Sequence, residues 1–188
     1  MLADNLRVAF ESGYSNAATS LSKLTKDKIQ FNNFHYNFHR LDSDFFNKQV
    51  SFSRNGGSHL ITTEIFGDIT GKSYLFLSDK EFEILTSGVV NSDLKEEFIK
   101  EMDNVLSASV ITHLSNNLNL KMYGDIPLFV GKVMGKVEDI IFDDFNEQAE
   151  EVYINSIFFS FEAQPLVTPF FVWVVDSQVQ HVLESKVN

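Results

Sequence analysis

Apolar residues recur along this chain with two different periods. Between residues 94 and 110 they fall every three or four positions, as expected for one face of an α-helix, at Leu94, Phe98, Ile99, Met102, Val105, Leu106 and Val110. Asp93 is a candidate N-cap, and Glu96 would complete a capping box with it. The pattern therefore predicts a long helix that begins near Asp93 and continues to about residue 117.

Shorter segments alternate apolar with polar residues or are apolar throughout, which is typical of strands. We predict strands at residues 28–39, 49–54, 59–69, 72–77, 120–130, 151–162 and 169–175. The sequence Asn55-Gly56-Gly57 predicts a hairpin turn between the second and third of these strands.

The predicted elements come in the same order twice. Residues 15–22 and 108–115 both end in Thr-x-Leu-Ser, and both belong to a predicted long helix that leads into a strand. Later in each half, an apolar run ends in an Asp, Asp79 or Asp176, placed as the N-cap of a short helix. We predict a single α+β domain over residues 1–188 with pseudo-symmetric halves at about 1–90 and 93–188. One continuous, mostly antiparallel sheet would carry two long helices on one face.

Composition excludes several classes of function. The net charge of −11 disfavours binding to nucleic acid and to anionic membranes. The absence of cysteine excludes disulfides, thiolate metal sites and thiol nucleophiles. The N-terminal residues lack a charged segment followed by an apolar one, so no signal peptide is expected. No apolar run is long enough to span a bilayer. We therefore expect a cytoplasmic protein without membrane insertion.

The candidate chemistry lies on the predicted helix at 93–117. Glu101 and Asn104 are three residues apart and so share one face of the helix, with Glu97 one turn before them. Pro127 follows Asn104 by 23 residues. A carboxamide can orient a water molecule, and a carboxylate can bind a cationic group of a partner. The alternative interpretation of such a pair is an ordinary solvated helix face.

The residue types and spacing of Glu101, Asn104 and Pro127 resemble the active-site motif of the CheC/CheX/FliY family of chemotaxis phosphatases. Glu97 occupies the position where that family carries Asp or Ser. Residues 13–22, with Asn-Ala-Ala-Thr-Ser-Leu-Ser, and residues 67–77 also resemble segments of these proteins. The resemblance thus extends over most of the chain and implies a CheC-like fold.

The resemblance implies a phosphatase that hydrolyses the aspartyl phosphate of a CheY-like response regulator. Asn104 would align the attacking water, and Glu101 would bind a cation of the partner, such as its lysine. Glu97 and Pro127 would support the site. The resemblance implies no metal or cofactor held by this chain, because the phosphorylated receiver supplies Mg²⁺.

A first copy of the site is degenerate. The register of the repeat places Val8, Glu11 and Phe34 where the Glu, Asn and Pro of a first motif would lie. The prediction is therefore one active site, in the second half. A CheD-like deamidase and a second copy of the chain stay open as further partners. The competing functions are a non-catalytic adaptor, of the deamidase-partner or flagellar-switch type, and a dimeric scaffold that uses an exposed edge strand.

Two other clusters of polar residues are weaker candidates for a metal site. His35 and His39 would be about 13 Å apart along a strand, at roughly 3.3 Å per residue, which is too far to share a metal ion. The acidic run that contains Asp143, Asp144, Glu147, Glu150 and Glu151 lacks the spacing of an EF-hand, and we expect a solvated loop there.

Overall fold

The computed structural model describes residues 2–39, 58–135, 137–145, 152–176 and 178–187. The helices are α1 (Leu2–Thr25), α3 (Asp79–Leu85), α4 (Ser92–Leu118), α5 (Val137–Phe145) and α6 (Gln178–Val187). The strands are β1 (Ile29–His39), β2 (Ser58–Gly67), β3 (Gly71–Ser78), β4 (Met122–Gly124), β5 (Leu128–Val133), β6 (Val152–Phe161) and β7 (Phe170–Asp176). None of the described helices combines the length and apolar character needed to cross a bilayer.

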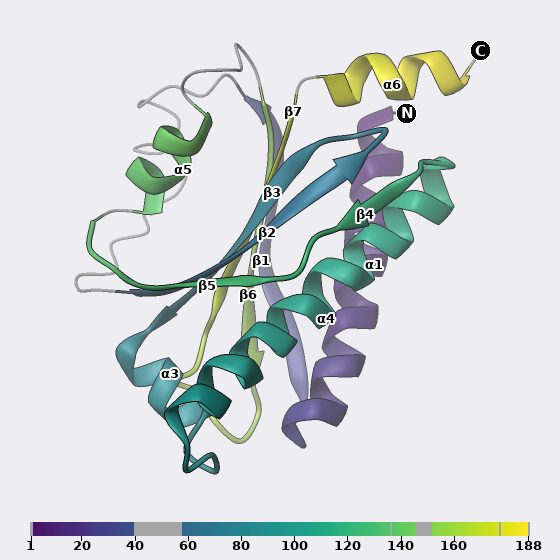
Figure 1. The fold of residues 1–188 in the computed structure, drawn as a ribbon. Coiled ribbons are helices and arrows are strands. Elements are labelled where there is room, and N and C mark those ends of the chain that lie inside the picture. Colours follow the sequence, from purple (N-terminus) through teal and green to yellow (C-terminus); the bar gives the residue numbers. More distant parts are fainter. Residues whose placement is uncertain (1, 40–57, 136, 146–151, 177, 188) are drawn as a thin grey trace.

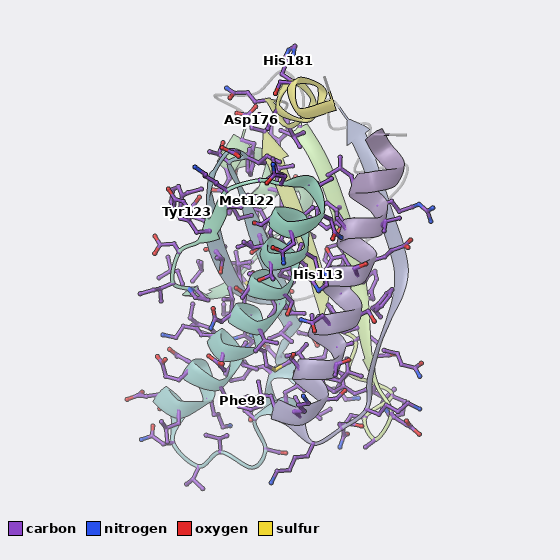
Figure 2. All side chains as sticks on the ribbon, turned by 90° about the vertical axis from the view of Figure 1, so that its right-hand side faces the viewer. Phe98, His113, Met122, Tyr123, Asp176 and His181 are labelled. Carbon is purple, nitrogen blue, oxygen red and sulfur yellow. The ribbon has the colours of Figure 1, made fainter. Side chains whose placement is uncertain are left out.

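The strands form one antiparallel sheet in the order β1-β6-β7-β3-β2-β4, and β5 also pairs with β2. The two long helices, α1 and α4, pack side by side over one face of this sheet (Figure 1, Figure 2). The α+β class and the helical layer predicted from the sequence are confirmed.

The two halves of the chain exchange their first strands. β1 leaves α1 and pairs with β6 of the other half, whereas β4 and β5 leave α4 and pair with β2. β3 and β7 pair with each other at the centre of the sheet. The sheet therefore has the same connectivity from either end, as the predicted pseudo-symmetry requires, and each half completes the sheet of the other.

The main core lies between the helices and the sheet. Phe10 and Tyr14 of α1 contact each other, and Phe10 meets Trp173 of β7 edge to face with ring centroids 5.8 Å apart. Gly13 lies where α1 crosses α4, and a Cβ atom there would come within 2.9 Å of the Val110 backbone. The glycine thus permits the close approach of the two helices that builds this core.

A second apolar cluster covers the opposite face of the sheet, where α5 packs (Figure 1). Ile141 of α5 is buried there with Tyr74 and Phe76 of β3. Asp144 accepts a hydrogen bond from the Tyr74 hydroxyl at 2.9 Å and pairs with Lys72 at 3.0 Å. The loop expected at Asp143 and Asp144 is therefore wrong, because these residues belong to a helix anchored on the sheet, although both are exposed as expected. Glu147, Glu150 and Glu151 lie outside the described residues.

Two helix starts differ from prediction, one by one position and the other by two. Asn91, not Asp93, is the N-cap of α4, and its side chain accepts from the Asp93 N–H. Ser78, not Asp79, caps α3 and forms a capping box with Glu81. In each case a neighbouring polar side chain reaches the free N–H groups of the first turn. The Asp176 side chain does accept from the Gln178 N–H at the start of α6.

The predicted strand at 120–130 is two strands, β4 and β5, separated by Asp125, Ile126 and Pro127. Proline has no N–H to donate to a ladder, so it interrupts the pairing with β2. The predicted strand at 49–54 and the turn at Asn55-Gly56-Gly57 lie outside the described residues.

Candidate functional site

The candidate side chains project from the N-terminal half of α4. Glu97, Glu101 and Asn104 are all exposed, as their spacing on the helix predicted. The Asn104 amide donates a hydrogen bond to the Glu101 carboxylate, with a distance of 3.4 Å between Nδ2 and Oε2. The two groups therefore lie together on the surface, with the amide oriented by its neighbour.

The segment that joins β4 to β5 forms the facing wall. Gly124, Asp125, Ile126 and Pro127 lie opposite α4 across a depression of about 350 Å³, which Glu97, Lys100, Glu101 and Asn104 line from the helix. Pro127 is buried and Ile126 is 82% exposed. The structure thus brings all four residues singled out in the second half to one depression, although 23 residues separate Asn104 from Pro127.

Lys100, Asp125 and Ile126 belong to the depression and were not singled out from the sequence. Lys100 Nζ pairs with Glu97 Oε1 at 2.5 Å, so the position that departs from the family pattern holds an ion pair. The Asp125 N–H donates to the Glu64 carbonyl of β2, which fixes the facing wall to the sheet. With three carboxylates and one lysine, the depression carries a net negative charge. The one sequence signal for Asp125 and Ile126 was their position directly before Pro127.

The corresponding face of α1 has different chemistry. Val8 is exposed, and Glu11 accepts from Arg7 at 3.3 Å within the same helix. Neither residue offers an amide, and the side chain of Phe34 lies outside the described residues. His113 of α4 is directed toward α1 and lines a shallow depression with Glu11 (Figure 2).

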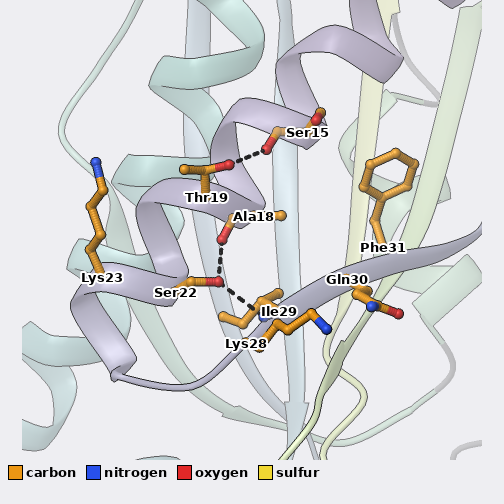
Figure 3. A pocket seen from close by; sticks show the side chains of 9 residues that line it. All are labelled: Ser15, Ala18, Thr19, Ser22, Lys23, Lys28, Ile29, Gln30 and Phe31. Carbon is orange, nitrogen blue, oxygen red and sulfur yellow. Dashed lines mark hydrogen bonds between the residues drawn. The ribbon is translucent and has the colours of Figure 1, made fainter.

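A larger groove of about 690 Å³ runs between α1 and β1 (Figure 3). Two of its hydroxyl groups, those of Thr19 and Ser22, form hydrogen bonds with the backbone. Thr19 donates to the Ser15 carbonyl, and Ser22 donates to the Ala18 carbonyl while it accepts from the Ile29 N–H. The bond between Ser22 and the Ile29 N–H holds the end of α1 against the start of β1.

A buried acid lies directly beneath the exposed pair. Asp103 is 0% exposed, on the sheet side of α4, and its Oδ2 accepts from Thr63 Oγ1 of β2 at 2.6 Å. Among the described residues its Oδ1 has no hydrogen-bond partner. Burial raises the pKa of the Asp103 carboxyl group to about 7, and the bond from Thr63 offsets that effect only in part. Asp103 was not among the candidates predicted from the sequence, although a charged residue beside the apolar stripe was a signal that could have found it.

Within the described ranges, no cluster of three or more His, Asp or Glu side chains has the geometry to hold a metal ion. His35 and His39 lie on β1, and their side chains are outside the described set. That this chain holds no cofactor of its own stays a prediction.

No protein-family model and no curated protein matches this sequence. Solved structures do match its fold. A solved chain of FliY of Thermotoga maritima superposes with a TM-score of 0.64 at 18% identity, over 97% of this chain and 95% of that chain. The FliM middle domain of Vibrio alginolyticus gives 0.58 at 8% identity, over 93% of this chain and 94% of that domain. CheX in a CheX–CheY–BeF₃–Mg²⁺ complex from Borrelia burgdorferi gives 0.54 at 14% identity, over 89% and 97%. The chain has a CheC/CheX/FliY-like fold.

Proposed function

We propose that this protein is a phosphatase that hydrolyses the aspartyl phosphate of a CheY-like response regulator. The observation that supports the proposal most directly is the exposed Glu101–Asn104 pair, which shares an acidic depression with Pro127. That arrangement stands on a fold shared with chemotaxis proteins, among them a CheX that was solved in complex with CheY. The fold is also shared with FliY and FliM, so the argument for catalysis depends on the residues of the site.

The proposed chemistry needs little from this chain. An aspartyl phosphate is an activated acyl phosphate, so hydrolysis depends mainly on positioning and electrostatics. The Asn104 amide holds a water molecule in line with the phosphorus–oxygen bond of the acyl phosphate. Water attacks phosphorus, that bond breaks, and the receiver aspartate leaves as a carboxylate with release of inorganic phosphate. Glu101 holds the Asn104 amide in place through the hydrogen bond already present.

Charge would guide the docking of the receiver. The depression carries Glu97, Glu101 and Asp125 against the single cation of Lys100. Glu101 is free to accept a charge-assisted hydrogen bond from a lysine of the receiver. Because Glu97 already pairs with Lys100, we assign it a supporting role. Mg²⁺ and the phosphoryl group both arrive with the receiver in this proposal, so this chain contributes no cofactor.

The decisive experiment measures phosphate release from a Mg²⁺-loaded CheY-type receiver charged with an acyl phosphate. We expect the wild-type chain to accelerate release, and Asn104→Ala to lower kcat on the order of 10²–10³-fold, because it removes a positioned polar group of the transition state. Binding of the receiver loaded with BeF₃⁻ and Mg²⁺ should be retained. Asn116→Ala is the matched control, since Asn116 is an exposed asparagine of α4 outside the depression.

A non-catalytic adaptor is the alternative, because the fold is shared with the FliM middle domain as well as with CheX. An adaptor would bind its partner with the same affinity after Asn104→Ala and would not release phosphate from any receiver. Failure of the wild-type chain to accelerate phosphate release from every cognate receiver would overturn the proposed activity and leave the adaptor.

A further inference from the structure

The two walls of the depression are fixed to consecutive residues of one strand. Thr63 of β2 donates to Asp103 of α4 at 2.6 Å. The next residue, Glu64, accepts from the Asp125 N–H of the facing wall at 2.9 Å. The distance between the exposed pair on α4 and the facing segment is therefore determined by how each wall sits on this short stretch of β2.

Thr63 bonds one wall and lies close to the other. Its hydroxyl bonds Asp103, and its methyl group lies 3.3 Å from the position that a Cβ atom would take on Gly124. That hypothetical Cβ would also lie 2.9 Å from the end of the Ile111 side chain, so the glycine lets the facing wall approach α4 closely. A shift of α4 at Asp103 would change the width of the depression directly.

We propose that Asp103 and Thr63 are positioning residues, which place Asn104 and Glu101 at the correct distance from Gly124 to Pro127. The value of this placement for catalysis rests on the proposed phosphatase function, but the placement itself does not. Asp103 precedes Asn104 in the chain, so movement of the buried carboxyl group is transmitted through one peptide unit to the exposed amide.

The internal repeat supports this assignment independently. The residue that corresponds to Asp103 in the first half is Phe10, which packs on Trp173 as an ordinary core residue. The same half lacks the exposed pair and has Val8 and Glu11 instead. A buried acid is costly without full hydrogen bonding, and a phenylalanine satisfies the core position in the other half. The acid occurs in the half that also carries the amide.

The environment of Asp103 makes the placement sensitive to pH. Thr63 of β2 faces the Asp103 side chain. One turn further along α4, the Ser107 hydroxyl is hydrogen-bonded to the Ser73 hydroxyl of β3. From α1 the neutral Asn16 amide donates to Ser109 of α4, and Lys100 and Glu101 line the depression on the solvent side of α4. Burial is the main cause of the raised pKa, about 7, and no charged group contributes to it. Ionisation would leave a buried charge with one hydrogen bond, which favours displacement of that turn toward water.

The first test follows the side-chain amide of Asn104 by NMR, in the isolated protein, from pH 5.5 to 8.5. Its signals are assigned from their loss in Asn104→Ala. We expect them to shift with a midpoint near 7 in the wild type and to be flat in Asp103→Asn. Thr63→Val should move the midpoint upward, because the bond that lowers the pKa is gone. Ser107→Ala removes a buried hydroxyl from the same helix and should leave the titration unchanged.

The second test measures kcat and KM of phosphate release over the same pH range, after subtraction of spontaneous release from the receiver. Wild-type kcat should fall above pH 7 by up to about tenfold per pH unit, for one ionising group. Asp103→Asn should keep kcat independent of pH in that range. Thr63→Val should lower kcat on the order of tenfold with a smaller change in KM, whereas the neighbouring Thr62→Val should not.

The outcomes separate the two proposals. Asn104 signals that titrate alike in wild type and Asp103→Asn would overturn the positioning role whatever the activity. Unchanged kcat in Thr63→Val would do the same. A titration that disappears in Asp103→Asn, together with no phosphate release from any receiver, would retain the positioning role and remove the proposed phosphatase.

Discussion

The two long helices occupy corresponding places in the fold but differ in the chemistry of one turn. α4 carries Glu101, Asp103 and Asn104 where α1 carries Val8, Phe10 and Glu11. Both helices pack on the same face of the sheet, and each exchanges its following strand with the other half. The fold therefore requires an apolar stripe from both helices, but it does not require the exposed pair or the buried acid.

The difference separates residues kept for packing from residues available for chemistry. Phe10 is 1% exposed and contacts both Tyr14 and Trp173, so it contributes to stability. Asp103 is equally buried but bears a polar group with an unpaired oxygen among the described atoms. A core position that accepts an aromatic ring in one half and an acid in the other indicates a specific use for the acid.

Phe10→Ala should give the largest effect on stability. Loss of a buried aromatic side chain leaves a cavity and lowers the free energy of unfolding by about 3–5 kcal/mol. Urea denaturation followed by circular dichroism measures the change. Val8→Ala, on the exposed face of the same helix, serves as control and should change stability by no more than about 0.5 kcal/mol. A small loss for Phe10→Ala would contradict the interpretation of α1 as a packing helix.

Asp103→Asn should remove the pH dependence of stability that comes from the buried acid. Its counterpart in the first half, Phe10, has no ionisable group. The pKa of about 7 in the folded protein is above the ordinary value of 3.8, so the folded state holds a proton that the unfolded state has released between these values. Stability from this group is thus greatest at low pH and is lost as the pH rises to 7, by about 4 kcal/mol in total. Denaturation of both proteins at pH 4 to 8 should show a larger fall in stability for wild type than for the variant, and the difference between them should be this loss. Parallel curves for the two proteins would contradict a buried, titrating acid.

Glu101→Gln tests whether the exposed face binds a cation. Removal of the charge should weaken binding of a receiver loaded with BeF₃⁻ and Mg²⁺ by about 1.5–3 kcal/mol, the range for hydrogen bonds to charged groups. The difference between wild type and variant should shrink at high salt, because salt screens the partly exposed pair. Calorimetric titration at two ionic strengths measures both effects. Glu96→Gln makes the same charge change on α4 outside the depression, and an equal loss there would show a general effect of net charge.

The smallest effect is expected from transplantation of the pair. The double variant Val8→Glu, Glu11→Asn would restore the residue types of the motif on α1 but should not release measurable phosphate. Phe10 still replaces the buried acid, and Phe34 still replaces the proline. The test uses Asn104→Ala as background, so that activity from the first site would be visible. Recovery of activity would show that the exposed pair alone is sufficient and that its support is dispensable.

The exposed pair could be predicted from the sequence because its geometry is local. Glu101 and Asn104 lie three residues apart on one helix, and the apolar stripe of that helix indicates which face is exposed to solvent. The link to Pro127 came from resemblance in residue type and spacing. It could not have come from the helix alone, because β4 lies between them and the strand breaks at Asp125 to Pro127.

Other features depended on contacts between distant parts of the chain. The acidic residues at 143–144 show no periodic pattern that would predict a helix. Contacts with the sheet hold α5 in place, namely the burial of Ile141 and the bonds of Asp144 to Tyr74 and Lys72. The N-cap of α4 is Asn91 and not the predicted Asp93. Several polar residues there can act as caps, and the geometry of the chain selects one.

By itself, the sequence determined the two long helices, most of the strands, the repeat that relates the halves, and the exposed face that carries Glu101 and Asn104. These follow from periodicity and residue type over a few turns. The tertiary structure decided that the halves exchange strands, that Glu97, Lys100 and Pro127 share one depression, and that Asp103 is buried against Thr63. Each of these depends on which surfaces pack together when the sheet forms. The burial and pKa of Asp103 and the distances across the depression are set by contacts between segments and not by any single segment.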